Sequence, residues 1–481
     1  MIMKKVFQFL NDNKMELFIL AGIIFIFGSF KIFNYSFSYD TDLIILDSKN
    51  IMDSWLGLGR YFLVFIKTLF CMYDNLFLIN LLTYTNVFIY SALLIYFFNI
   101  GLEKHNILRD ILCILILVTS PFFLEQYNFT LQSFEVSFSM ILLVLSYIAT
   151  YYYLSNKKLR YGLLTILLLL MIFGTYQSFI NLYIIGVLIS LYKLHDPSIK
   201  NNLINIMKTI ILFVISLIGY LVLSKVIQQV FHITTTSYLT DMIMWNKQSI
   251  FMTLFGFLKD IVKTGLGVGK IINLAFIISY LIMFIFAIKN RKDKISFMYI
   301  IFLMISPFLL NIVTGSRVIF RSLLGLSIVS SFFFFESYDY HKIIKHLVIL
   351  CVVSQFINCF LLLYFDYQRY LNDVNISSKI YKDCGNSNDI TVVIRGIEYT
   401  EENIKAYKGE VMGRSYFEWT IDGMNADRYR IHNFMKIHGY DVKLPTEEDY
   451  NRIGNILFEN EYPNDGYYIK EDNICFVNFG N

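Results

Sequence analysis

Charged residues are scarce in this chain: they make up 16% of its 481 residues, whereas 56% are hydrophobic. Because a soluble globular enzyme has roughly a quarter of its residues charged, the composition excludes that class. Transmembrane β-barrels are excluded too, because their strands alternate apolar and polar residues. Continuous apolar runs recur here instead, as in residues 17–30 and 161–173. The composition predicts a protein of membrane-spanning helices that contacts the lipid bilayer.

Two recognisable patterns are also missing. No CxxC or HExxH pattern occurs, so the sequence signals no protein metal site, and we expect no cofactor. No dense basic stripe lies outside the short loops between apolar segments, so we expect no nucleic-acid partner.

The charges that are present divide the chain into two parts. Residues 366–481 contain 13 Lys and Arg against 20 Asp and Glu, a net charge of −7. Since the whole chain carries +4, residues 1–365 carry +11. We expect a basic, polytopic transmembrane domain over 1–365 and a small acidic domain over 366–481, which is long enough to form its own core.

Hydropathy predicts about eleven spanning helices in the first domain. They are expected to begin near Leu17, Leu76, Ile107, Leu131, Tyr161, Tyr176, Leu203, Ile271, Ile295, Val318 and Ile343. The fifth and sixth are almost continuous, so one long helix or a re-entrant pair is an alternative for them.

Lys and Arg concentrate in alternate connections, for example 157–160 and 289–294, whereas the intervening short connections 125–130 and 174–177 contain none. Because Lys and Arg near helix ends favour the cytoplasm, this pattern places the N-terminus inside. After an odd number of spans the acidic domain is outside. We therefore expect a multi-pass protein of a cytoplasmic membrane with an extracytoplasmic C-terminal domain.

Two outer segments are longer than a turn, and each contains an apolar stretch with isolated charges, at residues 55–71 and 250–266. We expect each stretch to lie along the outer membrane face with its apolar side down and its charges up. A spanning helix with central charges is the alternative.

The acidic domain has the pattern of a small α/β fold. We expect a strand over 390–395, a helix over 426–437, and a second helix that begins with a capping box at 446–449. Asn464-Asp465-Gly466 predicts a turn before the last strands. Cys384 and Cys475 either form a disulfide or remain free thiols.

Asp40 and Asp42 follow the first apolar run and are separated only by Thr41. Carboxylates two residues apart point to the same side of an extended segment. One of them is suited to act as a general base, because its neighbour disfavours its ionisation. Solvated anchors at a helix end are the alternative.

Three arginines are exceptions to the inside bias, because they lie on the predicted outer side: Arg60, Arg317 and Arg321. Arg321 lies a turn inside an apolar run, so it needs a carboxylate or an anionic ligand such as a lipid phosphate, unless it snorkels to headgroups. Hydrogen-bonding groups gather at two predicted outer helix ends. They are Glu125 and Gln126 after the third span, and Tyr176 and Gln177 between the fifth and sixth.

Taken in order, these pieces resemble the bacterial membrane glucosyltransferases of the Gtr type II family, which belong to the GT-C structural class. Ser120-Pro121-Phe122, Trp419 and Asn425-Ala426-Asp427-Arg428 add to the resemblance, whose order extends over nearly the whole chain. The family more often has adjacent carboxylates, whereas Thr41 separates them here. This leaves open which aspartate is the base.

The resemblance implies inverting transfer of a hexose, glucose or a related sugar, from a polyprenyl-phosphate donor to a cell-surface glycan. Asp40 or Asp42 would deprotonate the acceptor. The leaving phosphate would be held by Arg60, Arg317 and Arg321. Sugar or acceptor would contact Glu125, Gln126, Tyr176, Gln177 and Trp419.

Two other functions fit an apolar polytopic chain. A flippase or transporter of lipid-linked sugars would have polar groups near the midplane and repeated halves, and neither is clear in the sequence. A polysaccharide polymerase or ligase usually has Arg-rich outer loops, and few arginines occur there.

Overall fold

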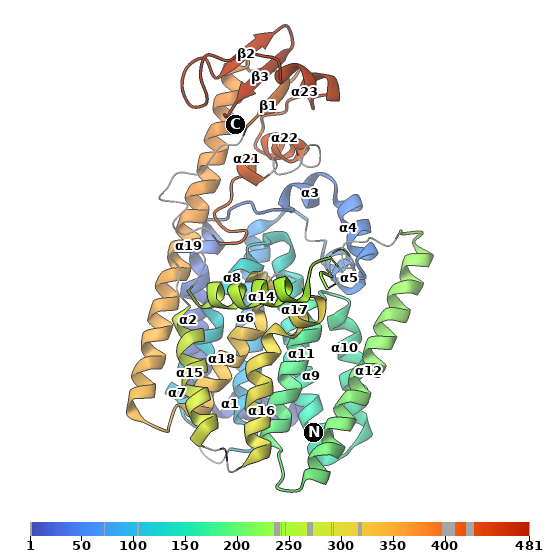
Figure 1. The fold of residues 1–481 in the computed structure, drawn as a ribbon, viewed down its shortest axis with the longest axis vertical. Helices are drawn as coiled ribbons and strands as arrows, with labels where there is room; N and C mark the ends of the chain where they lie inside the picture. Colours follow the sequence, from blue (N-terminus) through green and yellow to red (C-terminus); the bar gives the residue numbers. More distant parts are fainter. Residues whose placement is uncertain are drawn as a thin grey trace. The chain divides into compact units, whose positions relative to one another are not determined.

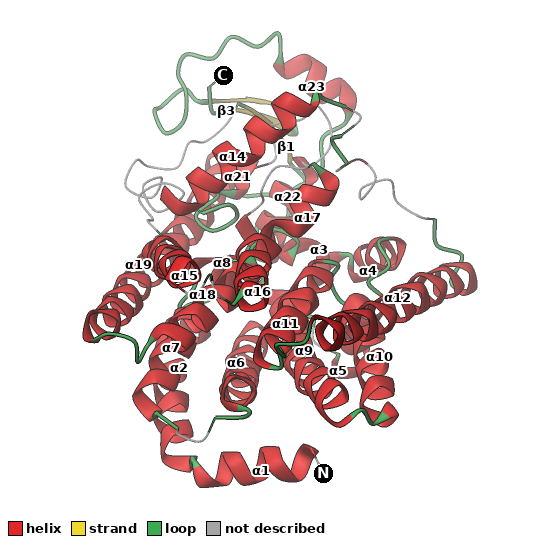
Figure 2. Cartoon of the chain, turned by 60° about the horizontal axis from the view of Figure 1, so that its bottom comes forward, coloured by secondary structure: helices red, strands yellow, loops and turns green. Residues whose placement is uncertain are grey.

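The computed structural model describes most of the chain. The described residues are 2–71, 73–102, 105–234, 241, 243–245, 247–266, 273–289, 291, 293–315, 320–396, 409–419 and 428–480. They divide into two compact units. Unit 1 contains Met1–Phe33 and Lys49–Phe360, and unit 2 contains Asn34–Ser48 and Leu361–Asn481. The described chain is mainly helical, and its strands form one small sheet near the C-terminus (Figure 2).

Six helical stretches among the described residues are long and apolar enough to cross a membrane. They are α2 (Lys14–Phe33), α6 (Leu76–Asn99), α9 (Thr130–Asn156), α12 (Ile199–Val230), the stretch Lys294–Thr314, and α19 (Lys342–Asp383). The stretch Lys294–Thr314 combines α16 (Lys294–Ile305), η1 (Ser306–Phe308) and α17 (Leu309–Thr314). A seventh candidate is the pair α7 (Ile107–Val118) and α8 (Pro121–Tyr127), which is bent by 52°.

The remaining predicted spans correspond to shorter helices, each of 14 to 16 residues. They are α10 (Leu159–Phe173), α11 (Ser178–Lys193), α15 (Leu274–Lys289) and α18 (Leu324–Ser337). A helix thus lies at each predicted position, but the count of eleven spans is not confirmed, because about 20 residues are needed to cross a bilayer. The fifth and sixth predicted spans are separate helices joined by residues 174–177.

Helices α6 and α9 form the centre of unit 1, with most of their residues buried. Small hydroxyl residues let them approach closely and hydrogen bond. The Thr83 and Ser133 hydroxyls are 2.8 Å apart, and the Asn86 amide donates to the Ser137 hydroxyl over 3.1 Å. These two pairs satisfy polar groups within an apolar bundle, as a lipid environment requires.

Helix α14 (Ile250–Leu266) has the bounds that hydropathy predicted for the second outer segment. Figure 1 shows it lying crosswise to α15 and α16. Its large apolar residues remain exposed, with Phe251 at 79% and Phe255 at 63%. An apolar surface of this kind fits a helix that lies along a membrane face.

The first predicted surface helix differs from the expectation. It is divided into α4 (Ser48–Gly57) and α5 (Tyr61–Phe70). The Lys67 ammonium is fully buried and lies 2.9 Å from the buried Glu135 carboxylate. The prediction that the charges of this stretch lie up, on the side away from the membrane, was therefore wrong for Lys67. A buried ammonium needs such a partner, because an isolated charge in an apolar interior is very costly.

The described residues of unit 2 form the end of α19, a small sheet and four short helices. The helices are α3 (Thr41–Leu46), α21 (Tyr416–Trp419), α22 (Arg428–Ile437) and α23 (Glu447–Ile453). The strands are β1 (Thr391–Arg395), β2 (Tyr468–Glu471) and β3 (Ile474–Asn478), in the order β1-β3-β2. Strand β3 runs parallel to β1, with Thr391 opposite Ile474, and antiparallel to β2.

Several predictions for the acidic region are confirmed by these elements. The expected strand is β1, the expected turn has Gly466 at φ 88°, and Thr446 and Asp449 form the capping box of α23. Cys384 and Cys475 form a disulfide that joins the end of α19 to β3. The apolar core of this unit includes both cysteines, Val392 and Val477.

Candidate active site

The acidic pair lies in the 34–48 segment of unit 2, where α3 begins. Asp40 occupies the position before α3 with φ 73°, and its side chain makes no cap hydrogen bond to the helix. Aspartate tolerates this left-handed conformation better than most residues, and such conformations cluster at functional sites. The side chain of Asp40 is 21% exposed, whereas that of Asp42 is fully buried.

Asp42 forms a bidentate ion pair with Arg430 of α22. The Arg430 Nε donates to Oδ2 over 2.7 Å, and Nη2 donates to Oδ1 over 2.6 Å. The Asn433 amide adds a donor to Oδ2 at 3.2 Å. Burial acts to lower the pKa of Arg430, but attraction to Asp42 outweighs it, so the pKa is raised. Both oxygens of Asp42 thus accept hydrogen bonds from one charged guanidinium, which fixes the orientation of its side chain.

Asp40 shares the same guanidinium but retains accessible surface. Its Oδ1 lies 3.6 Å from the Arg430 Nη2, and the Arg430 guanidinium lies 4.0 Å from the centre of the Tyr39 ring. The two aspartates therefore have different settings within one charge cluster. Asp40 can meet a ligand from solvent, whereas Asp42 cannot do so without losing its buried partner.

A second buried network supports the segment that carries the pair. The guanidinium of Arg369, on α19, lies between two buried carboxylates, 3.0 Å from Asp366 and 3.1 Å from Asp373. It also donates to the Phe37 carbonyl over 2.9 Å. The 34–48 segment is thereby attached to α19, within unit 2.

The chain around α21 completes this network. The Asp373 carboxylate accepts from the Ser415 hydroxyl over 2.6 Å and from the Tyr416 amide over 3.1 Å. The Tyr416 hydroxyl donates to the Ser38 carbonyl over 2.7 Å, and its ring stacks on Phe434 of α22 at 4.5 Å. The acidic pair is thus positioned by three distant segments of sequence.

Three of the residues predicted to bind phosphate and sugar lie together in unit 1. The Arg60 Nε donates to the Gln177 Oε1 over 3.3 Å, and its guanidinium lies 5.0 Å from the centre of the Tyr176 ring. The Gln177 amide also donates to the Leu58 carbonyl. The structure therefore brings Arg60 together with Tyr176 and Gln177, from which it is over a hundred residues apart in sequence.

Gly59 has a specific part in placing Arg60. Its φ is 79°, and a Cβ atom there would lie 2.7 Å from the Tyr220 hydroxyl and 2.9 Å from the Ser224 hydroxyl. The turn between α4 and α5 therefore requires glycine for both conformation and space.

Glu125 and Gln126 lie in α8 and are buried within unit 1. The carbonyl oxygen of the Gln126 side chain accepts no hydrogen bond from the described residues. Arg321 belongs to η2 (Phe320–Ser322), which packs against α8, and its guanidinium lies 5.1 Å from the centre of the Phe129 ring. These three predicted residues thus lie on two adjoining elements of one unit.

Two predicted site residues cannot be placed. Arg317 lies outside the described residues. Trp419 ends α21, but its side chain lies outside them. Of the sequence motifs, 425–427 also fall outside the described chain.

Arg430 and Asn433 were missed by the sequence reasoning, which pointed to residues 425–428 instead. A signal for Arg430 was available. Together with Asn433 and Phe434 it follows the three- and four-residue spacing of one helix face, and Phe434 is buried there. An arginine on the apolar face of a helix needs a carboxylate partner, and the 34–48 segment offers two.

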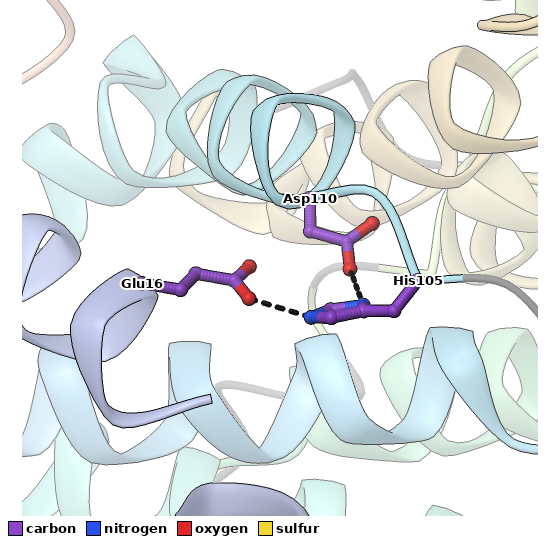
Figure 3. Close-up of side chains that lie close together, drawn as sticks. All are labelled: Glu16, His105 and Asp110. Carbon is purple, nitrogen blue, oxygen red and sulfur yellow. Dashed lines mark hydrogen bonds and ion pairs between the residues drawn. The ribbon is translucent and has the colours of Figure 1, made fainter. Parts of the chain in front are cut away.

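Glu16, His105 and Asp110 form another cluster, in unit 1 (Figure 3). The His105 ring lies between the carboxylates, with Nε2 2.6 Å from Glu16 and Nδ1 2.8 Å from Asp110. These are hydrogen-bond lengths, so a metal ion bound by all three groups would have to displace the imidazole contacts.

Apolar helices long enough to cross a membrane, with charged and aromatic residues gathered at defined positions, define a helical membrane protein. The family described as Glucosyl transferase GtrII matches residues 29–365. The chain belongs to this family, which confirms the resemblance drawn from the sequence and identifies a glucosyltransferase. No match was found among curated proteins or among solved structures. The matched region includes Asp40 and Asp42 but ends before Arg430.

Proposed function

We propose that the chain transfers glucose from a polyprenyl-phosphate-linked donor to a cell-surface glycan, at the outer face of a bacterial cytoplasmic membrane. The observation that carries this proposal is the unequal acidic pair. Asp42 is buried in an ion pair with Arg430, whereas Asp40 is partly exposed beside it. Family membership supports the sugar, and the apolar helices support a donor carried by a lipid.

In this proposal Asp40 is the general base. Its carboxylate takes the proton of an acceptor hydroxyl, whose oxygen then forms a bond to the anomeric carbon of the donor. The bond from that carbon to the phosphate oxygen breaks, and the phosphate leaves with the electron pair. Attack from the face opposite the phosphate inverts the configuration. Asp42 remains paired and keeps the loop in place.

The leaving phosphate needs a cation that stabilises its developing charge. We assign this role to Arg60, Arg317 and Arg321. Tyr176, which lies under the Arg60 guanidinium, offers a stacking surface for a sugar ring. The buried Gln126 carbonyl, which accepts no hydrogen bond from the described residues, suits a sugar hydroxyl.

The orientation belongs to the same proposal. The bias of Lys and Arg towards alternate connections favours an N-terminus inside and unit 2 outside. The Cys384–Cys475 disulfide supports this orientation, because disulfides persist in oxidising compartments.

The test compares Asp40→Asn with wild type in membranes supplied with labelled polyprenyl-phosphate glucose and the surface glycan. Loss of a general base lowers kcat by about 10²–10⁴-fold. The control is Asp47→Asn, which removes a carboxylate from the same segment outside the pair. Full transfer by Asp40→Asn would contradict the assignment of the base. Movement of the donor across the membrane without a new glycosidic bond would contradict the transferase and indicate a flippase.

A further inference from the structure

We propose that Arg430, which lies beyond the region matched to the family, is a positioning residue for the acidic pair. By anchoring Asp42 it sets the direction in which the Asp40 carboxylate points. The inference rests on the proposed function, because it assigns the control of the base in that reaction to the C-terminal region of the chain.

The first support is the number of residues that the Arg430 guanidinium contacts. Arg430 binds both oxygens of Asp42 at 2.6 and 2.7 Å, lies 3.6 Å from Asp40 and lies against the ring of Tyr39. Three residues within a stretch of four thus contact a single side chain. A planar guanidinium fixes both distance and orientation of such contacts, which an ammonium cannot do.

The second support is the rigidity of the helix that carries Arg430. Asn433, one turn further along α22, also donates to Asp42. Phe434 stacks on Tyr416 at 4.5 Å and contacts the Phe37 ring at 6.0 Å. Helix α22 is therefore packed against the segment that it orients, so the guanidinium has a defined position.

The third support is the backbone between the two aspartates. Asp42 lies in the first turn of α3, and the Asp40 carbonyl accepts from the Ile44 amide over 3.0 Å. Displacement of Asp42 would therefore rotate the start of α3 and move Asp40 with it. Asp40 has a sparsely populated conformation that persists only when its surroundings determine it.

The phosphate-binding residues proposed above belong to other elements, so loss of Arg430 leaves the donor-binding groups in place. The expected effect is a fall in kcat with little change in donor KM. A displacement of about 1 Å in a reacting group can cost about 100-fold in rate. We therefore expect Arg430→Gln to lower kcat by about 10- to 100-fold and to leave the donor KM within about twofold.

Three further variants give the test its controls. Arg452→Gln makes the same exchange at a half-exposed arginine of α23 and is expected to retain wild-type kcat. Arg430→Lys keeps the charge but not the two-pronged contact, so its kcat is expected to lie between those of wild type and Arg430→Gln. In the double variant Asp42→Asn with Arg430→Gln, the loss of kcat should be smaller than the product of the two single losses, because the residues are coupled.

The outcomes separate this inference from the proposed function. Wild-type kcat in Arg430→Gln, while Asp40→Asn is inactive, overturns the positioning role and leaves the transferase assignment standing. Independent losses in the double variant overturn it as well. If Arg430→Gln does not accumulate, wild-type kcat in Arg430→Lys overturns it. Absence of transfer by the wild-type chain would instead count against the proposed function.

Discussion

Replacement of Arg369 by methionine is predicted to destabilise unit 2 strongly. The guanidinium is 1% exposed and contacts the Asp366 and Asp373 carboxylates, which are equally buried, and the Phe37 carbonyl. Methionine fills much of the same volume but supplies no donor, so two buried carboxylates lose the guanidinium that they share. Breaking a buried ion pair from one side costs about 3–5 kcal/mol.

The assay is urea unfolding of the intact protein in detergent, followed by brief proteolysis that cleaves unit 2 only when it has opened. With an m value of about 1–3 kcal/mol/M, the predicted loss lowers the urea midpoint by at least about 1 M. Lys382→Met, at an exposed position of the same helix, is the matched control. A midpoint for Arg369→Met equal to that of the control would refute the reasoning, because it would mean that the two carboxylates do not depend on the guanidinium.

Three shorter predictions test other features. Gly59→Ala is expected to raise the donor KM by about tenfold through displacement of the neighbouring arginine. As a control, Gly256→Ala should leave the donor KM unchanged, because the added carbon meets nothing within 4 Å. Equal donor KM values for Gly59→Ala and Gly256→Ala would contradict the steric argument. Burial lowers the pKa of His438, so the folded state disfavours its protonation. The urea midpoint of unit 2 should therefore fall as the pH drops below about 6.5. The variant His438→Gln should show a smaller fall, and an equal fall in this variant and in wild type would contradict the role of His438. Reduction of the Cys384–Cys475 disulfide, which spans 91 residues, should cost unit 2 about 4–5 kcal/mol by loop entropy, whereas Cys384→Ala with Cys475→Ala should not respond to reductant.

Local patterns in the sequence were sufficient for much of the fold. Residues 250–266 were predicted to lie along the membrane face because they form an apolar stretch with isolated charges, and α14 has those bounds. Thr446 and Asp449 were recognised because a capping box depends on residues three apart. The interactions that define these features act within one or two turns, so the sequence contains all of the information.

Partners that are distant in sequence were beyond this kind of reasoning. Lys67 was expected to lie on the side of its helix away from the membrane, but it pairs with Glu135 on another helix. The partner of Asp42 is 388 residues further along the chain. Hydropathy and charge could show that Arg430 needs a carboxylate, but not which one, because that depends on how the chain folds back on itself.

The region that matches the family does not contain every residue of the candidate site. The matched region includes both aspartates, Arg60 and Gln177. The Arg430 side chain that binds Asp42 lies in α22, after the end of the matched region. Within this chain, recognition of the acidic pair from sequence was therefore possible, whereas the difference between Asp40 and Asp42 required the structure.

The division of unit 2 between residues 34–48 and 361–481 has a consequence for biosynthesis. The aspartates leave the ribosome early, whereas Arg430 is made only after the last apolar helix of the bundle has been synthesised. During nearly the whole of translation, Asp42 therefore exists without the guanidinium that fixes it. The site is assembled last, so an incomplete chain that stops before α22 has the acidic pair but not its final arrangement.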